Sequence, residues 1–362
     1  MSAIAKDIVT PAQARSALLG QVEDRLHGLL AAETSRWSAV DPRAAVPVEV
    51  AAALIASGGK RLRPAFCLSG FLSAGGDPAQ EPVAVDAAAA LEMLHAFALL
   101  HDDVLDDSPL RRGKPTAHER HAAAHRAAGW AGEPRRFGEG VAALAGDLAH
   151  IYADRLVSAL SPAARGIWDE LRTEIIIGQY LDIRVAAERI ADPELSRWIA
   201  ICKSGRYTVH RPLALGAAIA GRLDLVPAFT RYGAALGEAF QLRDDLIDAF
   251  GDSTVSGKPT GLDFARQKMT LLVTLAMPRD DRISRLLAGQ NGDGTADGAA
   301  EEAADGATLA QLITDLDVRG EVEDRIGQLV EQAQAAIAIA PLDPGWRDEL
   351  ARVAVEVAYR QS

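Results

Sequence analysis

Two clusters of aspartates are the residues whose type and spacing point most directly to chemistry. Asp102, Asp103 and Asp106 form a DDxxD pattern at the end of the apolar run LEMLHAFALLH. The pattern returns in FQLRDDLIDAFGD, where its members are Asp244, Asp245 and Asp248. On a helix the carboxylates of each cluster project from one surface, and each like-charge pair at this spacing costs about 0.2–0.5 kcal/mol. A bound cation would offset that repulsion.

Clustered carboxylate oxygens suit hard divalent cations, and Mg²⁺ in particular is shared between carboxylates and substrate phosphates. Two such clusters could clamp a diphosphate through bridging ions. A single DDxxD on a helix is more often a solvated surface. The repetition favours a metal site, because each copy ends an apolar helix and is followed by a basic loop with glycine and proline.

A basic loop follows the first cluster directly. Pro109 lacks an amide hydrogen and disfavours helical geometry at Ser108, so we expect the helix to stop near Asp107. Arg111 and Arg112 then lie just beyond the carboxylates, accompanied by a lysine at position 114. Because the guanidinium fork matches phosphate oxygens in pairs, these arginines suit a diphosphate.

A second basic loop, GGKRLRP, precedes the first cluster. It combines two flexible glycines with Lys60, Arg61 and Arg63, and Pro64 suits the opening of a helix. Free amide groups at a helix start attract anions, so the loop resembles a phosphate cradle. Taken alone, the motif is equally typical of a capped surface turn.

The elements that must position these groups are helices. The chain has 362 residues, of which 49% are hydrophobic and 5% aromatic, and strand-like alternation is hard to find. Apolar residues recur at helical spacing, which predicts helices near 11–33, 47–56, 64–75, 83–107, 138–160, 164–190, 194–221, 224–250, 267–288, 308–338 and 345–360.

One segment, 289–307, is rich in Gly, Asp, Glu and Ala and has no large hydrophobic residue. This composition predicts a mobile loop or linker. The residues after it suffice for two or three helices that pack on the same body, so we expect one all-α domain over residues 1–362.

Composition also excludes several classes of protein. A formal net charge of -12 argues against general nucleic-acid binding. No run approaches the ~18 consecutive apolar residues of a membrane span, and the first residues lack a signal-peptide layout. We therefore expect a cytoplasmic protein without a membrane span. Cys67 and Cys202 lack metal-type spacing, which indicates buried free thiols.

Taken in order, GGKRLRP, HDDVLDDSPLRRGKPTAH, KSG, FQLRDDLIDAFGD, GKPTGLD and QKMT resemble the all-trans isoprenyl diphosphate synthases of the polyprenyl synthetase family, most closely bacterial short-chain geranylgeranyl diphosphate synthases. The resemblance implies a helical bundle around a deep central cavity, usually as a homodimer. It implies that the two aspartate clusters face each other across the cavity mouth and hold Mg²⁺, about three ions per active site, with Mn²⁺ as a substitute.

The resemblance also assigns roles to basic and polar residues. The positions that match isopentenyl diphosphate ligands are Lys60, Arg63, His95 and Arg112. The positions that match allylic diphosphate ligands are Arg111, Lys203, Ser204, Gln241, Lys258 and Lys268. His95 has a plain alternative as a core histidine, and lysines are more often surface groups. Ser204 stands where the family often has threonine, and Gly205 replaces a common alanine, which we expect to loosen the helix without affecting the chemistry.

The implied reaction is a head-to-tail 1'-4 condensation of isopentenyl diphosphate with C5, C10 or C15 allylic diphosphates. Metal ions and basic side chains neutralise the leaving diphosphate. The double bond of isopentenyl diphosphate then attacks the allylic cation, and a proton is lost to the departing diphosphate. No protein base is identified in the sequence.

Product length in the family depends on side chains before the first DDxxD. Here Phe97 lies five residues before Asp102, and small Ala98 lies four before, a combination that favours geranylgeranyl diphosphate (C20). Farnesyl (C15) and C25 products stay open, because Phe97 could equally be ordinary helix packing. A class I terpene cyclase and a non-catalytic partner subunit are the alternatives from other classes. A cyclase normally has a different second metal motif, and a partner subunit usually has eroded DDxxD motifs.

Overall fold

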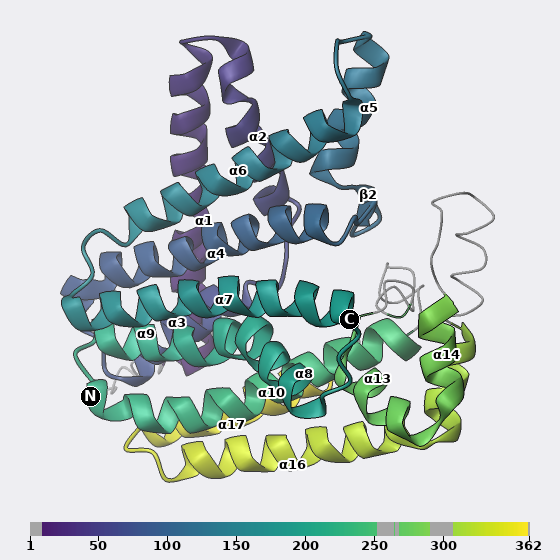
Figure 1. Cartoon of the computed structure of the whole chain (residues 1–362). Helices are drawn as coiled ribbons and strands as arrows, with labels where there is room; N and C mark the ends of the chain where they lie inside the picture. Colours follow the sequence, from purple (N-terminus) through teal and green to yellow (C-terminus); the bar gives the residue numbers. More distant parts are fainter. Residues whose placement is uncertain (1–8, 252–263, 265–267, 290–306, 361–362) are drawn as a thin grey trace, which may run out of the picture. The chain divides into compact units, whose positions relative to one another are not determined.

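A computed structural model describes residues 9–251, 264, 268–289 and 307–360 of the chain. The described part is almost entirely helical, which confirms the all-α prediction (Figure 1). Its contacts define two compact units. Unit 1 comprises Met1–Trp168, Arg211–Pro227 and Pro341–Glu349, and unit 2 comprises Asp169–His210, Ala228–Ala340 and Leu350–Ser362. The single-domain organisation expected from the sequence stays a prediction.

Unit 1 is built around a long, alanine-rich helix, α4. Its helices are α1 (Pro11–Ser38), α2 (Val46–Ala56), α3 (Leu62–Ser73), α4 (Glu81–Leu105), α5 (Ala117–Ala128), α6 (Pro134–Leu156), the first part of α7 (Pro162–Glu188) and α9 (Arg211–Ile219), with short 3₁₀ turns at Pro42–Ala45, Pro78–Gln80 and Leu223–Leu225. The four alanines at 87–90 are fully buried, and α4 packs on α1, α3, α6 and α9. Small side chains let these helices approach closely.

By length and composition alone, α4 is long and apolar enough to cross a membrane. A core helix can have the same length and composition, so α4 does not overturn the expectation of no membrane span. Of its most apolar window, 72% is buried inside the structure, so the helix is weak evidence for a span.

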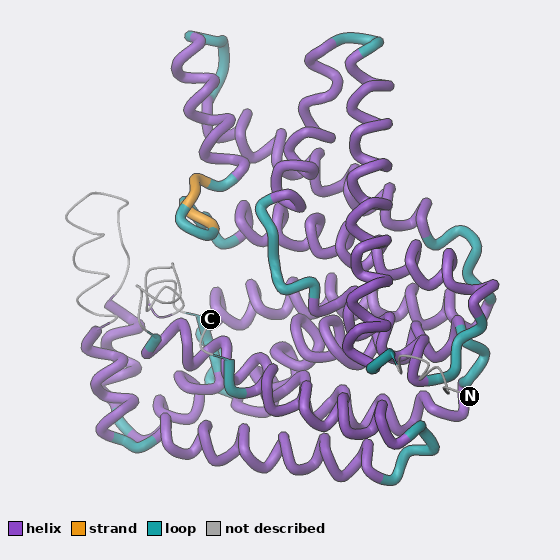
Figure 2. The backbone as a smooth tube through the Cα atoms, turned by 180° about the vertical axis from the view of Figure 1, so that it is seen from behind, coloured by secondary structure: helices purple, strands orange, loops and turns teal. Residues whose placement is uncertain are grey.

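The end of α4 follows from its sequence. The helix stops at Leu105, Asp106 caps it, and Asp107 has a left-handed φ of 49°, close to the predicted end near Asp107. A two-stranded antiparallel hairpin follows, in which β1 (Leu110–Arg111) pairs with β2 (Lys114–Pro115) (Figure 2). Arg112 and Gly113 between the strands have φ of 52° and 71°, and positive φ at both central residues is what a type I′ turn requires. Arg112 therefore sits at the tip of a tight turn.

Helix α5 was not predicted. Its sequence AHERHAAAHRAA has no large aliphatic residue, so it carries no visible apolar period. It nevertheless buries His118 and His125, and Ala117 joins Val50 and Leu100 in a cluster that links it to α2, α4 and α6. The buried face of α5 thus consists of alanines and histidines. A search for periodic large apolar side chains does not detect such a face.

Unit 2 contains the second aspartate cluster. Its elements are the second part of α7, α8 (Pro193–Ala200), the π-helix η3 (Ile201–His210), α10 (Val226–Phe250), α13 (Leu271–Ala276), the 3₁₀ turn η5 (Met277–Arg279), α14 (Asp281–Gly289), α16 (Val318–Ala338) and the end of α17 (Pro344–Ala358), and residues 307–315 are also helical. Buried Glu238 of α10 binds Arg197 of α8 and Arg325 of α16, so one carboxylate ties three helices together.

The predicted helix at 194–221 is in fact three elements. It comprises α8, the π-helix η3 and α9 in succession. A π-helix is rare and is frequently found at functional sites. Because its apolar residues recur almost as in an α-helix, periodicity did not distinguish the two.

Candidate active site

The first aspartate cluster lies at the C-terminal end of α4, in unit 1. Asp102 and Asp103 occupy the last turn, and the Asp106 amide donates to the Asp102 carbonyl at 2.9 Å. Arg111 of β1 reaches back over the cluster, with Nη2 2.7 Å from Asp103 Oδ1 and 3.6 Å from Asp102 Oδ2. The hairpin thus places a guanidinium on the carboxylates that it follows in sequence.

The charges of Asp103 and Arg111 depend on each other. Burial raises the pKa of the Asp103 carboxyl, while the hydrogen bond from Arg111 acts in the opposite direction. Burial works to lower the pKa of Arg111, but the hydrogen bond to Asp103 and the charges of Asp102 and Asp106 leave that pKa raised. The arginine therefore stabilises charged carboxylates that would otherwise repel one another.

This cluster fits a divalent cation by its donor chemistry. Among the residues that the structure describes, no three His, Cys, Asp or Glu side chains converge as a metal-binding group. The carboxylates of Asp102 and Asp103 are instead assembled around the Arg111 guanidinium, which stands in for a cation. Oxygen donors on one helical turn are the ligand type that Mg²⁺ prefers.

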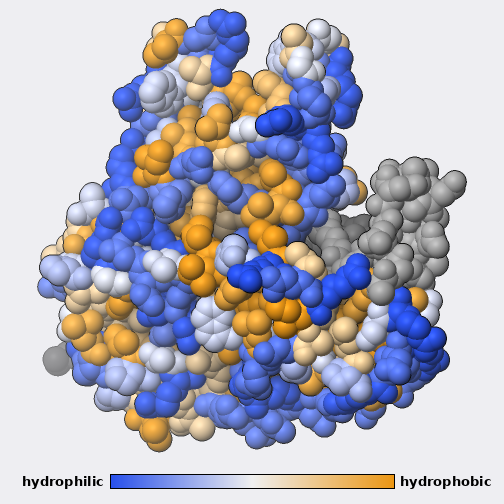
Figure 3. Space-filling model, viewed as in Figure 1, coloured by the Kyte–Doolittle hydropathy of each residue, from blue (hydrophilic) through white to orange (hydrophobic). Residues whose placement is uncertain are grey.

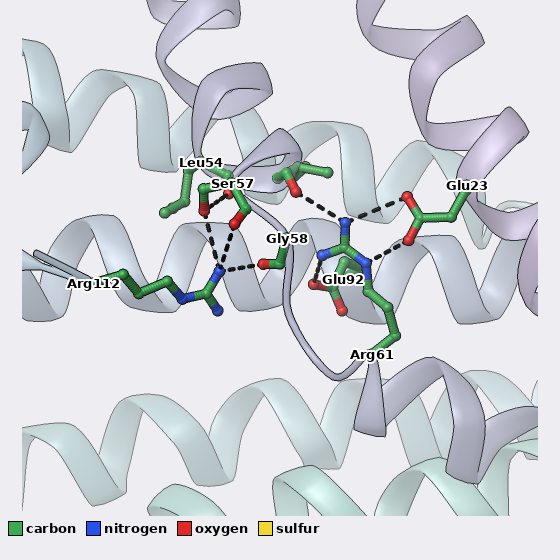
Figure 4. Close-up of polar contacts among 8 residues, drawn as sticks. Glu23, Leu54, Ser57, Gly58, Arg61, Glu92 and Arg112 are labelled. Atoms are coloured by element: carbon green, nitrogen blue, oxygen red, sulfur yellow. Dashed lines mark hydrogen bonds and ion pairs between the residues drawn. The ribbon is translucent and has the colours of Figure 1, made fainter. Parts of the chain in front are cut away.

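The GGKRLRP loop and the hairpin turn meet in unit 1. Arg112 donates to the Gly58 carbonyl and, at 3.1 Å, to the Ser57 hydroxyl (Figure 4). A Cβ atom on Gly59 would lie 3.2 Å from Arg112 Nη2, so a side chain there would crowd the guanidinium. Two loops that are about 50 residues apart in sequence thus form one basic surface.

His95 of α4 belongs to the same surface. Burial, followed by the positive charges of Arg63, Arg111 and Arg112, holds the pKa of His95 well below its usual range. Three of the four residues assigned to isopentenyl diphosphate, Arg63, His95 and Arg112, are thus within electrostatic reach of one another. The fourth, Lys60, lies on the same loop and is exposed. A neutral histidine among cations can bind an anion only by donating its ring N–H.

Phe97 of α4 packs against α6. Its ring centroid is 4.6 Å from that of His101, and 5.0 Å from that of His150 on α6. Phe97 is 9% exposed, whereas neighbouring Ala98 is half-buried. Phe97 is therefore packed against other rings, and its predicted effect on product length stays a prediction.

The second aspartate cluster lies at the C-terminal end of α10, in unit 2. Asp245 is buried and accepts a hydrogen bond from Gln241 Nε2 at 2.6 Å, while Asp244 is half-exposed. Asp248, one turn later, is half-buried. Gln241, assigned to the allylic diphosphate, thus orients a carboxylate of the cluster.

Arg360 is a residue of this region that the sequence did not indicate. It forms an ion pair with Asp244, and its guanidinium lies 3.6 Å from the centroid of the Phe240 ring. It also donates to the Phe240 carbonyl at 3.2 Å. A lone arginine near the end of the chain carries no motif, so only the folded contacts reveal it.

The π-helix carries Lys203 and Ser204. Lys203 Nζ lies 2.7 Å from Asp182 Oδ2 on α7, and both side chains are about three-quarters buried. Sequence reasoning missed Asp182, although a lone acid in the apolar stretch IIIGQYLDI could have drawn attention to it. The lysine is thus held by a carboxylate from a neighbouring helix.

Gly205 does more than loosen the helix, contrary to the expectation from the sequence. A Cβ atom on Gly205 would lie 2.7 Å from the carbonyl carbon of Gly237 on α10, and one on Gly237 would lie 2.5 Å from Gly205 Cα. Gly237 precedes Gln241 by one helical turn. The glycine pair therefore lets the Lys203 segment approach α10 near its aspartate cluster.

The remaining assigned lysines are Lys258 and Lys268. Lys258 falls outside the described residues, as does most of the predicted loop at 289–307. Lys268 is described and lies three residues before α13. The structure thus assembles one set of predicted residues in unit 1 and another in unit 2. That the two aspartate clusters face each other stays a prediction.

Comparisons with known proteins show which proteins the chain is similar to. The family model described as polyprenyl synthetase matches residues 46–304. A crystal structure of geranylgeranyl pyrophosphate synthase from Corynebacterium glutamicum, complexed with isoprenyl diphosphate and magnesium, is similar with a TM-score of 0.85 and 35% identity over 95% of this chain and 98% of that one.

Curated relatives differ in the product that their names give. Nonaprenyl diphosphate synthase from Mycobacterium tuberculosis is 32% identical, with 81% of each chain covered. Farnesyl diphosphate synthase from Geobacillus stearothermophilus is 33% identical, with 71% of this chain and 82% of the relative covered. The similarity therefore extends to proteins named for products of very different length.

Proposed function

This chain belongs to the polyprenyl synthetase family, and from that premise we propose that it condenses isopentenyl diphosphate with C5, C10 or C15 allylic diphosphates to give geranylgeranyl diphosphate. It is a prenyltransferase of isoprenoid biosynthesis by family. The observation that carries the proposal is the unit 1 surface, where Arg112 and the GGKRLRP loop form a basic region beside the carboxylates of Asp102 and Asp103.

Each group on this surface has a part in binding or charge stabilisation. Lys60, Arg63, His95 and Arg112 would hold isopentenyl diphosphate, because cations and a ring N–H match phosphate oxygens. The aspartates of both clusters would hold Mg²⁺, which supplies charge stabilisation to a leaving diphosphate. Arg111, whose Nη2 lies 2.7 Å from Asp103 Oδ1, would exchange this carboxylate for phosphate oxygens when substrate arrives.

The C20 product is the finer part of the proposal. Phe97 is a single aromatic ring five residues before Asp102, packed on His150, and the residue between it and Leu99 is small. The named products of the relatives run from farnesyl to nonaprenyl, so C15 and longer products are the alternatives. The repeated DDxxD disfavours a terpene cyclase, and intact aspartates disfavour a non-catalytic subunit.

We also propose a cytoplasmic homodimer. Three apolar side chains spaced seven residues apart on α6 are exposed: Phe137 by 37%, Leu144 by 62% and Ile151 by 59%. Hydrophobic side chains gather over α6 on the face seen in Figure 3. Exposed apolar stripes of this kind usually mark a protein interface, and a second copy would cover it. Sedimentation of the purified protein tests this.

A product assay tests the enzymatic proposal. Purified protein is incubated with Mg²⁺, isopentenyl diphosphate and a C5, C10 or C15 allylic diphosphate, and the products are sized by chromatography. We expect elongation that stops mainly at C20. A dominant C15 or C25 product would reject only the length assignment, whereas absence of any elongation would reject the synthase proposal.

A further inference from the structure

Arg61, in the middle of the GGKRLRP loop, has an unusual backbone conformation. Its φ of 47° and ψ of 39° are left-handed, and it follows Gly58 and Gly59 with φ of 83° and 152°. For a residue with a side chain, the left-handed region costs about 1–2 kcal/mol. Arg61 also begins α3 without a side-chain cap. The loop therefore follows a path that its backbone alone does not favour.

The side chain of Arg61 holds the loop in that path. Its Nε lies 2.5 Å from Glu23 Oε1 of α1, its Nη1 lies 2.5 Å from Glu92 Oε1 of α4, and its Nη2 donates to the Ile55 carbonyl of α2 at 2.9 Å (Figure 4). The Arg61 and Glu92 side chains are only 13% and 7% exposed. One guanidinium thus ties the loop to three helices.

These contacts occupy every nitrogen of the Arg61 guanidinium. Nε, Nη1 and Nη2 all donate to protein oxygens, and two carboxylates neutralise the charge. An anion would have to displace at least one of these carboxylates from a largely buried position. Arg61 is therefore poorly placed to bind phosphate.

The residues on either side of Arg61 are the ones that the loop presents. Lys60 precedes it, Arg63 follows it, and Arg112 contacts the loop at Gly58 from the hairpin. A Cβ atom on Gly59 would lie 3.2 Å from Arg112 and 3.8 Å from Arg61, so the two guanidinium groups flank the same glycine. A change in the path of the loop would move all three proposed diphosphate ligands together.

We propose that Arg61 is a positioning residue for isopentenyl diphosphate. Through its contacts with Glu23 and Glu92 it holds the backbone of residues 58–61, and thereby the proposed ligands of the diphosphate, in place. The proposal rests on the proposed function, because it concerns the same diphosphate site. The alternative is that Arg61 binds the diphosphate directly. The two alternatives predict opposite effects on diphosphate binding when Glu23 loses its charge. If Arg61 binds the diphosphate directly, removal of a competing carboxylate strengthens binding. If Arg61 positions the loop, removal of its partner weakens binding.

Glu23→Gln is the principal test, because Glu23 is 35% exposed and the substitution keeps its shape, so we expect the protein to fold. Asp86→Asn is the matched control. Asp86 also forms an ion pair between α4 and α1, with Arg25 at 2.5 Å, but this pair does not involve the loop. Arg61→Met and the double variant with Glu23→Gln complete a cycle that measures the coupling between the two residues.

We expect Glu23→Gln to raise KM for isopentenyl diphosphate about tenfold, with KM for the allylic substrate within twofold of wild type. Asp86→Asn should leave both KM values within twofold. The double variant should resemble Arg61→Met, because both glutamate and arginine act in one network. A KM for isopentenyl diphosphate that is unchanged or lowered in Glu23→Gln, with wild type active, would overturn the positioning role.

A second measurement does not need catalysis. Calorimetric titration with inorganic diphosphate should show about tenfold weaker binding to Glu23→Gln than to Asp86→Asn or wild type. If the wild-type protein elongates no prenyl chain, the proposed function fails while this titration still decides the positioning role. Equal diphosphate affinity in all three proteins would overturn it.

Discussion

The contact between Gly205 and Gly237 makes a strong prediction about Gly205→Ala. The new Cβ would lie 2.7 Å from the Gly237 carbonyl carbon and 2.9 Å from its oxygen. Ordinary contact begins at 3.4 Å, so the π-helix and α10 must separate by about 0.7 Å (3.4 − 2.7) or distort locally. Both atoms of Gly237 are backbone, which cannot rotate away as a flexible side chain would.

Two effects set the stability of this variant. Overpacking of a buried contact typically costs about 1–3 kcal/mol, while replacing glycine by alanine in a helix gains up to about 1 kcal/mol. We therefore expect a net loss of about 0–3 kcal/mol in the free energy of unfolding. The protein should remain folded, so its activity can be measured.

Activity should suffer more than stability. Lys203 lies two residues before Gly205, and Gln241 with its aspartate partner lies one turn after Gly237. A misplacement of about 1 Å can lower a rate by about 10²-fold. We expect kcat/KM for the allylic substrate to fall about 10- to 100-fold, measured by incorporation of labelled isopentenyl diphosphate.

Gly166→Ala is the control, because a Cβ atom on this exposed residue of α7 would meet nothing within 4 Å. It should keep wild-type activity and a melting temperature equal to or slightly above wild type. Gly237→Ala should behave like Gly205→Ala, since its Cβ would lie 2.5 Å from Gly205 Cα. If Gly205→Ala matches Gly166→Ala in both rate and stability, the close approach of the Gly205 and Gly237 backbones does not constrain the site.

Three further predictions concern the aspartates, the histidine and the phenylalanine. Asp102→Ala or Asp244→Ala should lower turnover by orders of magnitude with an unchanged circular dichroism spectrum, and wild-type rates would contradict the metal assignment. Phe97→Ala should shift products beyond the wild-type length in the sizing assay, since it removes a packed ring, and an unchanged product would mean ordinary packing. Because the pKa of His95 lies well below about 6.5 in the folded protein, only the unfolded chain takes up its proton as pH falls below that value, so the free energy of unfolding should fall by up to about 1.4 kcal/mol per pH unit. His95→Gln should reduce the change of the free energy of unfolding with pH, measured by urea unfolding between pH 7 and pH 5. An equal pH dependence in the variant and the wild type would contradict the lowered pKa of His95.

Local features of the fold could be predicted from sequence. The apolar run at 83–107 corresponds to α4 at Glu81–Leu105, and Pro109 correctly indicated its end. The i,i+4 spacing of the aspartates predicted that they would share the end of a helix, which both clusters do. Such features depend on residues within a few turns of one another.

Features that depend on distant contacts could not be predicted. Arg61 resembles its basic neighbours in sequence, yet its partners come from α1 and α4, 38 and 31 residues away. Arg360 is 116 residues from Asp244 (360 − 244), and no local pattern relates them. The glycine at 205 was interpreted by helix propensity alone, whereas the opposing backbone of Gly237 determines why it must be small.

The ion pair between Arg360 and Asp244 has a practical consequence for work with the protein. Arg360 lies two residues after α17, and its guanidinium is covered by the Phe240 ring and by the carbonyls of Phe240 and Val357. A substitution of Arg360, or a bulky label attached close to it, would alter the surroundings of a carboxylate assigned to metal binding. Labels and purification handles are therefore better attached away from the residues that follow α17.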